Sequence, residues 1–104
     1  MNAPQRIGML IKFTAQRGQR DALAEHLASL VEVAQAEVGT QVYLVSTSPA
    51  EPDAVYLIEV YADAGGLERH NAGEKIISAK GKTETLLAGP PQVVPLSPLA
   101  GKGL

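Results

Sequence analysis

The sequence of 104 residues contains no cysteine and no tryptophan. Without cysteine, the chain has no disulfides, thiolate nucleophiles, zinc ribbons or iron–sulfur clusters held by its own thiolates. Histidine is also scarce, since only His26 and His70 are present, which are too few for a typical structural zinc site. No flavin or nicotinamide fingerprint is present, and Gly65-Gly66 is only a turn. We therefore expect neither a metal nor a cofactor.

Long apolar runs are missing as well. None approaches the roughly 20 residues that a membrane-spanning helix needs, and the start of the chain, Met1 to Ile7, lacks the apolar centre of a signal peptide. Nine basic and eleven acidic residues give a net charge of −2, so there is no positive surface of the kind that binds nucleic acid. We expect a cytoplasmic protein that has neither nucleic acid nor a membrane as partner.

What is present fits one globular domain. Hydrophobic residues make up 45% of the chain, and this length is close to the common domain size and buries a real core. We predict a single domain over residues 1–104, with a core from about 7 to 96. Residues 97–104 show no periodicity and are expected to form a tail or an arm.

Hydrophobic periodicity predicts a β-α-β-β-α-β order. We expect strands at 7–14, 41–47, 54–61 and 92–96, helices at about 18–37 and 74–87, a helical turn at 67–71 and a loop at 48–53. This order is the ferredoxin-like split motif, an α+β fold. It predicts one four-stranded antiparallel sheet with the helices on one face.

Both faces of this sheet are apolar. We expect one face to pack against the helices; its residues are Ile7, Met9, Ile11, Phe13, Tyr56, Ile58 and Val60. The opposite face would leave a large apolar patch in water; its residues are Leu10, Tyr43, Val45, Val55 and Leu57. The simplest cover is a second copy of the chain, which gives a two-fold homodimer. Lys12 and Glu59 are expected on this second face as a structural ion pair.

Several segments together resemble one known family. They are the turn Gln16-Arg17-Gly18-Gln19, the helix end Glu37-Val38-Gly39-Thr40, the strand from Tyr56 to Tyr61, and Leu67-Glu68-Arg69-His70. In this order they resemble the Pro-Gly-Lys turn, the Glu-x-Gly-Cys segment, the strand ending Glu-x-Trp and the Leu-Glu-x-His segment of the antibiotic biosynthesis monooxygenase (ABM) domain family. The likeness covers residues 7–96, and the family belongs to the dimeric α+β barrel superfamily.

The resemblance implies a homodimeric, cofactor-independent monooxygenase that uses oxygen and a small aromatic substrate, a quinol or a polycyclic phenol. The quinol-oxidising members share a histidine at the position of His70, which implies that His70 is the catalytic base. The sequence also departs from that pattern. Tyr61 stands where the family has a tryptophan, and Lys75 stands where some members have a second histidine.

This chemistry needs a dihydroxyaromatic that reacts with oxygen once it is deprotonated. The protein supplies a dry apolar pocket and a base. Histidine suits the base because an imidazole exchanges its proton near neutral pH. The residues expected to bind the substrate are Ile11, Phe13, Ile58, Tyr61 and Ile76, with Asn71 or Lys75 holding an anionic oxygen.

Other functions stay open. A dimer that binds a small ligand without chemistry is the alternative, favoured by the missing tryptophan and second histidine. Haem degradation fits poorly, because Ile11, His70 and Lys80 stand where those members have asparagine, tryptophan and histidine. A sugar-phosphate isomerase would need a phosphate cradle that the sequence lacks. We expect His26, Lys80 and Lys82 to be solvated surface residues.

Overall fold

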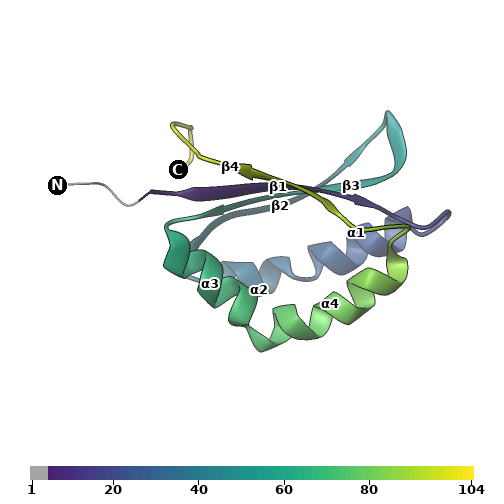
Figure 1. The fold of residues 1–104 in the computed structure, drawn as a ribbon, viewed down its shortest axis with the longest axis horizontal. Helices are drawn as coiled ribbons and strands as arrows, with labels where there is room; N and C mark the ends of the chain where they lie inside the picture. The colour runs from purple at the N-terminus through teal and green to yellow at the C-terminus, as the bar shows by residue number, and fades with distance from the viewer. Residues whose placement is uncertain (1–4) are drawn as a thin grey trace.

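The computed structural model describes residues 5–104, so the predicted polar start of the chain, Met1 to Ile7, lies partly outside the described residues. Two layers are present, a four-stranded sheet and a layer of helices on one of its faces (Figure 1). The strands are β1 (Ile7–Thr14), β2 (Thr40–Ser48), β3 (Glu51–Tyr61) and β4 (Gln92–Leu96). Their order is β2-β3-β1-β4, and every neighbouring pair is antiparallel. The predicted ferredoxin-like α+β fold is confirmed.

The helices differ in part from the prediction. They are α1 (Arg20–Ala28), α2 (Val31–Gln35), α3 (Ala64–Ala72) and α4 (Glu74–Leu86). The single helix predicted for 18–37 is divided at Ser29 and Leu30. The Ser29 hydroxyl donates to the His26 carbonyl, and the Leu30 amide bonds the Leu27 carbonyl three residues back. A serine side chain that competes for a helix carbonyl favours such a break.

Two other segments are more regular than predicted. The short turn predicted for 67–71 is the longer helix α3, which begins after Asp63, whose carboxylate accepts from the Gly66 amide at 2.9 Å. The predicted loop at 48–53 is a tight hairpin, because Glu51 already pairs with Ser48. Residues 97–104 form no helix or strand, as their lack of periodicity indicates. No helix in the described part of the chain is long and apolar enough to cross a membrane.

The strand register shows which side chains face the helices. Ile11 of β1 lies opposite Leu57 of β3, and Tyr43 of β2 lies opposite Glu59 of β3. Residues that lie opposite one another point to the same side of a sheet, so the odd-numbered residues of β1, of β2 from Tyr43 to Val45 and of β3 from Val55 to Tyr61 share the helix side, together with Val93 of β4. We call this side the inner face; it comprises Ile7, Met9, Ile11, Phe13, Tyr43, Val45, Val55, Leu57, Glu59, Tyr61 and Val93.

The predicted faces of β3 are therefore wrong. Val55 is 0% and Leu57 3% exposed beneath the chain's own helices, and Tyr43 and Val45 pack against the same core. Of the residues predicted to contact a second copy, only Leu10 points to the other side. Alternation cannot decide which apolar side of a strand meets the helices. The pairing register decides it, and a shift by one residue reverses every side chain.

The opposite side of the sheet, here called the outer face, is also apolar. Its central row crosses all four strands in register and consists of Leu44, Ile58, Leu10 and Val94. Leu44 is 50% and Val94 49% exposed in the single chain. Lys12 lies on this face but pairs with Glu51, not with Glu59 as predicted. An exposed apolar row of this kind typically marks an interface.

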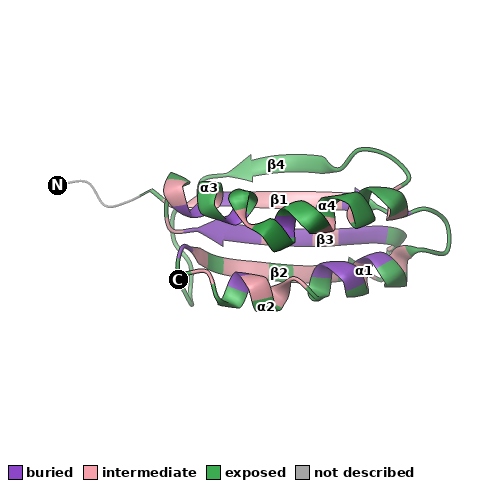
Figure 2. Cartoon of the chain, turned by 90° about the horizontal axis from the view of Figure 1, so that it is seen from below, coloured by how far each residue is buried: buried purple, intermediate pink, exposed green. Residues whose placement is uncertain are grey.

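Helix α3 approaches the start of β2 very closely, because two glycines face each other. A Cβ atom built on Gly66 would lie 2.8 Å from the Gly39 carbonyl oxygen, and one built on Gly39 would lie 2.7 Å from the Gly66 Cα. Neither position tolerates a side chain without movement of the backbone. This contact presses α3 against the sheet and places His70, one turn beyond Gly66, over β3. Figure 2 shows β3 as the most buried strand, whereas β4 is exposed along its length.

Candidate functional site

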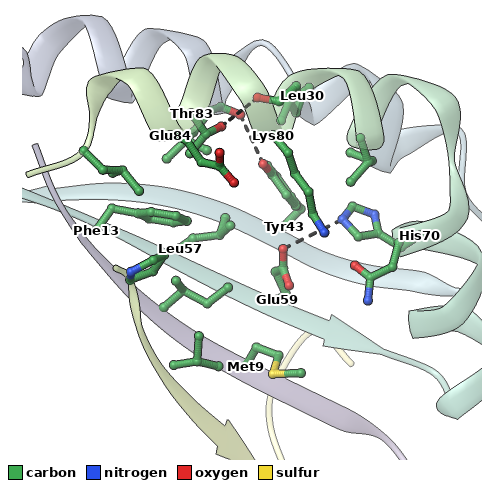
Figure 3. Close-up of a pocket in the computed structure, with 18 of the residues that line it drawn as sticks. Met9, Phe13, Leu30, Tyr43, Leu57, Glu59, His70, Lys80, Thr83 and Glu84 are labelled. Carbon is green, nitrogen blue, oxygen red and sulfur yellow. Dashed lines mark hydrogen bonds and ion pairs between the residues drawn. The ribbon is translucent and has the colours of Figure 1, made fainter. Parts of the chain in front are cut away.

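A cavity of about 400 Å³ lies between the inner face of the sheet and helices α1 and α4. Its volume falls in the range of sites for small molecules. Most of its wall is apolar and comes from four sources: the sheet, α1, α3 and α4 (Figure 3). The apolar residues include Met9, Ile11, Phe13, Leu27, Leu30, Leu57, Ile76, Ala79 and Val93.

His70 is the best-positioned polar group in this wall. It lies in the last turn of α3 and is only 3% exposed. Its Nδ1 is 2.7 Å from a carboxylate oxygen of Glu37, which also accepts from the Thr40 hydroxyl at 2.9 Å. A carboxylate can only accept, so the neutral imidazole carries its proton on Nδ1. Nε2 is then left as the proton acceptor.

The second imidazole nitrogen has no hydrogen-bond partner among the described residues. Its nearest carboxylate oxygen is on Glu59, 3.9 Å away, which is too long for a hydrogen bond. The ring is flanked by Tyr61, with centroids 5.4 Å apart, and by Tyr43, at 6.1 Å. These tilted aromatic contacts, together with Glu37, fix the orientation of the imidazole. The arrangement can take a proton from a hydroxyl group that enters the cavity.

Glu59 is a buried carboxyl in the same wall, 7% exposed. Burial raises its pKa. The Tyr61 oxygen is itself buried and has no hydrogen-bond partner within residues 5–104. Burial, with Glu59 next in importance, also raises the pKa of Tyr43 and Tyr61, so both keep their hydroxyl protons. A shifted buried carboxyl in a cavity is typical of functional sites.

The structure brings together most of the residues predicted for the site. Ile11, Phe13, His70, Asn71 and Ile76 all line the cavity. Ile58 does not, because it lies on the outer face. Tyr61 lies against the His70 ring and not in the cavity wall, and Lys75 is exposed outside that wall.

Three residues of the site were missed from the sequence: Glu37, Glu59 and Lys80. Glu37 lies 33 residues from His70, so no local pattern pairs them. Glu59 was placed on the wrong face of β3. Lys80 is exposed, as expected, but it also lines the cavity, which was not predicted. Its spacing from Ile76, four residues along one helix, was the available signal.

His26 was predicted to be a solvated surface residue, and this is wrong, since it is 8% exposed. Its Nε2 lies 2.9 Å from the Thr83 hydroxyl oxygen and 3.2 Å from the Ala79 carbonyl. These contacts join α1 to α4 behind the cavity wall. The role of His26 is therefore to hold the two helices together.

Among residues 5–104, no group of three or more histidine, aspartate or glutamate side chains is arranged to hold a metal ion. We therefore assign no metal ligands to the cavity. Its polar residues are Tyr43, Glu59, His70, Asn71, Lys80, Thr83 and Glu84.

Comparisons with known proteins agree with the fold. A sequence model described as ABM, antibiotic biosynthesis monooxygenase, matches residues 6–81, more than half of the chain. The structure is similar to PA3566 from Pseudomonas aeruginosa, with a TM-score of 0.85 and 27% identity over 96% of this chain and 100% of that one. It is also similar to NE2512, a protein of unknown function from Nitrosomonas europaea, with a TM-score of 0.83 and 28% identity over 97% and 96% of the two chains.

A third solved structure is that of a proposed antibiotic biosynthesis monooxygenase from Chloroflexus aurantiacus J-10-fl. The TM-score is 0.79, and the identity is 29% over 92% of this chain and 95% of that one. No curated protein matches the chain.

Proposed function

Because the chain belongs to the antibiotic biosynthesis monooxygenase family, we propose that it is a cofactor-independent monooxygenase that oxidises a quinol or polycyclic phenol with molecular oxygen. One observation carries this proposal. The His70 imidazole is held at Nδ1 by Glu37 and keeps Nε2 free at an apolar cavity of about 400 Å³.

The proposed reaction begins with the removal of a proton. Nε2 of His70 takes the proton of a phenolic hydroxyl, and Glu37 stabilises the imidazolium that forms. The resulting phenolate is rich enough in electrons to reduce oxygen directly. One oxygen atom enters the ring and the other leaves as water, so that a dihydroxynaphthalene becomes a hydroxynaphthoquinone. The apolar wall excludes bulk water from these steps.

We also propose that the protein is a homodimer, and that the outer face forms its interface. The row Leu44, Ile58, Leu10 and Val94 supports this, because it crosses the whole sheet and is not covered by helices. A two-fold axis would pack the same row of the second copy against it. The cytoplasmic location expected from the sequence also stays a prediction.

Oxygen consumption tests the proposed activity. Metal-stripped, flavin-free protein is mixed with an anaerobically prepared naphthohydroquinone, and a protein-free blank is subtracted to remove autoxidation. We expect uptake well above the blank with a hydroxylated quinone as product, and a loss of about 10²–10⁴-fold in His70→Ala.

The result that would contradict the base assignment is full turnover by a folded His70→Ala protein. No uptake by folded wild-type protein would favour the alternative, a dimer that binds an aromatic ligand without chemistry. In that case, ligands of this class would raise the melting temperature while no product forms.

A further inference from the structure

The ionisable groups that line the cavity differ in how they are held. They are His70, Glu59, Lys80 and Glu84. His70 is fixed by Glu37, and burial favours the neutral form of Glu59 by raising its pKa. Lys80 is the one ammonium group in the described wall. Lys80 is exposed at the edge of this wall, so water solvates its ammonium group when no ligand is bound.

Lys80 points into the cavity. It lies on α4, one turn after Ile76 and one turn before Glu84. Figure 3 shows its terminal nitrogen directed toward His70 and Glu59. Its long side chain therefore reaches from the helix toward the polar end of an otherwise apolar site.

No side chain within residues 5–104 pairs with this ammonium group, by ion pair or hydrogen bond. Glu84 has the four-residue spacing that favours a pair on a helix, yet the two do not form one. Glu59 does not serve as its partner either, since the one ion pair found for Glu59 among residues 5–104 is the 3.9 Å contact with His70. The ammonium group is thus available to a ligand.

Lys12, a lysine on strand β1, differs from Lys80 because side chains of the chain itself hold its ammonium group. Lys12, on the outer face, forms an ion pair with Glu51, and its ammonium lies 5.9 Å from the centroid of the Tyr56 ring. The chain therefore neutralises the lysine of the outer face with its own side chains. It leaves the lysine of the cavity without such a partner.

We infer that Lys80 holds an ionised oxygen of the ligand beside His70, and that the substrate class is an acidic hydroxyaromatic such as a hydroxylated quinol or naphthol. This inference deepens the proposed function and rests on it for the reaction. For a neutral hydroxyl, the O–H bond breaks, the proton moves to Nε2 of His70, and the electron pair stays on the oxygen that Lys80 holds. Lys80 thus takes the role that the sequence assigned to Asn71 or Lys75.

The test is binding by two ligands that differ in charge. The probes are 2-hydroxy-1,4-naphthoquinone, which is an anion at neutral pH, and its neutral methyl ether. Affinities are measured by calorimetry for the wild type, Lys80→Met and Lys80→Arg. Lys82→Met is the matched control, because Lys82 is exposed on the same helix, as Lys80 is, but lies outside the cavity wall.

A charge-assisted hydrogen bond leads us to expect that Lys80→Met loses about tenfold or more of its affinity for the anion. Its affinity for the ether should stay unchanged, because methionine keeps the aliphatic part of the side chain. Lys80→Arg should retain most of the anion affinity, and Lys82→Met should match the wild type for both ligands.

Unchanged anion binding by Lys80→Met would overturn the inference. An equal loss for both ligands would also overturn it, since it would show that Lys80 acts by packing alone. The proposed function fails separately: a protein that binds the anion through Lys80 but consumes no oxygen supports the inference about the ligand and contradicts the monooxygenase. Oxygen uptake by a protein that binds the anion and the ether equally well would support the monooxygenase and overturn the inference about Lys80.

Discussion

The two faces of the sheet differ in what covers them, although both are apolar. Leu57 and Ile58 are neighbours on β3, yet Leu57 is 3% exposed under the helices, whereas Ile58 lies in the uncovered central row of the outer face. The inner face carries Glu59, a buried carboxyl in the wall of the cavity, and helix α3 places His70 against the same cavity. Apolar content alone therefore does not distinguish a core from an interface. The strand register and the position of the helices do.

The largest effect should come from the polar contact that fixes His70. Glu37→Gln removes the charged acceptor of the Nδ1 proton and lets the imidazole adopt the other tautomer. We expect kcat to fall by about 10²-fold with little change in KM, because the cavity wall is untouched. Nitrogen-15 NMR of the imidazole should show the Nδ1-protonated form in the wild type and its loss in the variant. An unchanged kcat would remove Glu37 as a positioning residue.

The next prediction compares the two neighbours on β3. Leu57→Ala should lower the free energy of unfolding by about 2–5 kcal/mol, because it opens a cavity in the core of one chain. Ile58→Lys should instead leave the chain folded and shift the dimer toward monomer, because it places a charge in the proposed interface. Urea unfolding and sedimentation equilibrium measure the two effects. A folded Ile58→Lys protein that sediments like the wild type would contradict the assigned interface.

The sequence was sufficient for the fold, because its elements have clear periods and ends. β1 and α4 begin where predicted, and Ile11, Phe13 and Ile76 face the cavity as expected. It was not sufficient for the faces of β3, because Val55 to Tyr61 is apolar on both sides. Only the pairing with β1 decides between them.

The polar contacts of the site were beyond sequence reasoning for a different reason. Glu37 meets His70 only because α3 approaches β2 through Gly39 and Gly66, a contact between distant segments. The orientation of Lys80 depends likewise on how α4 lies over the sheet. Local patterns do not contain such long-range geometry.

The glycine contact beneath α3 gives a smaller effect. Gly66→Ala places a methyl group 2.8 Å from the Gly39 carbonyl oxygen and should cost about 1–3 kcal/mol, because backbone must move. Gly81→Ala is the matched control in α4, where a Cβ atom meets nothing within 4 Å. That variant should gain about 0.5–1 kcal/mol from helix propensity. Thermal unfolding of both checks the comparison, which fails if Gly66→Ala is as stable as the wild type.

The smallest effect is a difference in pH dependence between the faces. Burial raises the pKa of Glu59 in the folded state, so the unfolded chain releases this proton first as pH rises. The stabilising contribution of Glu59 is complete below its unfolded pKa and is lost as pH rises through the folded one. Urea unfolding should therefore show Glu59→Gln gaining stability relative to the wild type between pH 4 and pH 7.

Glu51, on the outer face, should behave in the opposite way. Its hydrogen bond from Lys12 holds its pKa below the usual range, so its contribution is present above the unfolded pKa and is lost as pH falls. Glu51→Gln should therefore lose stability relative to the wild type as pH rises from acid through the usual glutamate pKa, a window that lies below the one for Glu59. Equal signs for the two variants would contradict the assigned environments.

The most direct test of the two-face assignment uses Val93 and Val94, neighbours on β4 that are 50% and 49% exposed in the single chain. Because the chain has no cysteine, Val93→Cys and Val94→Cys each report on one face through the rate of alkylation by iodoacetamide. We predict that 2-naphthol protects Val93→Cys, which lines the cavity, and that raising the protein concentration protects Val94→Cys, which lies in the central outer row. Two cysteines that respond alike to both changes would contradict the assignment of ligand and partner to opposite faces.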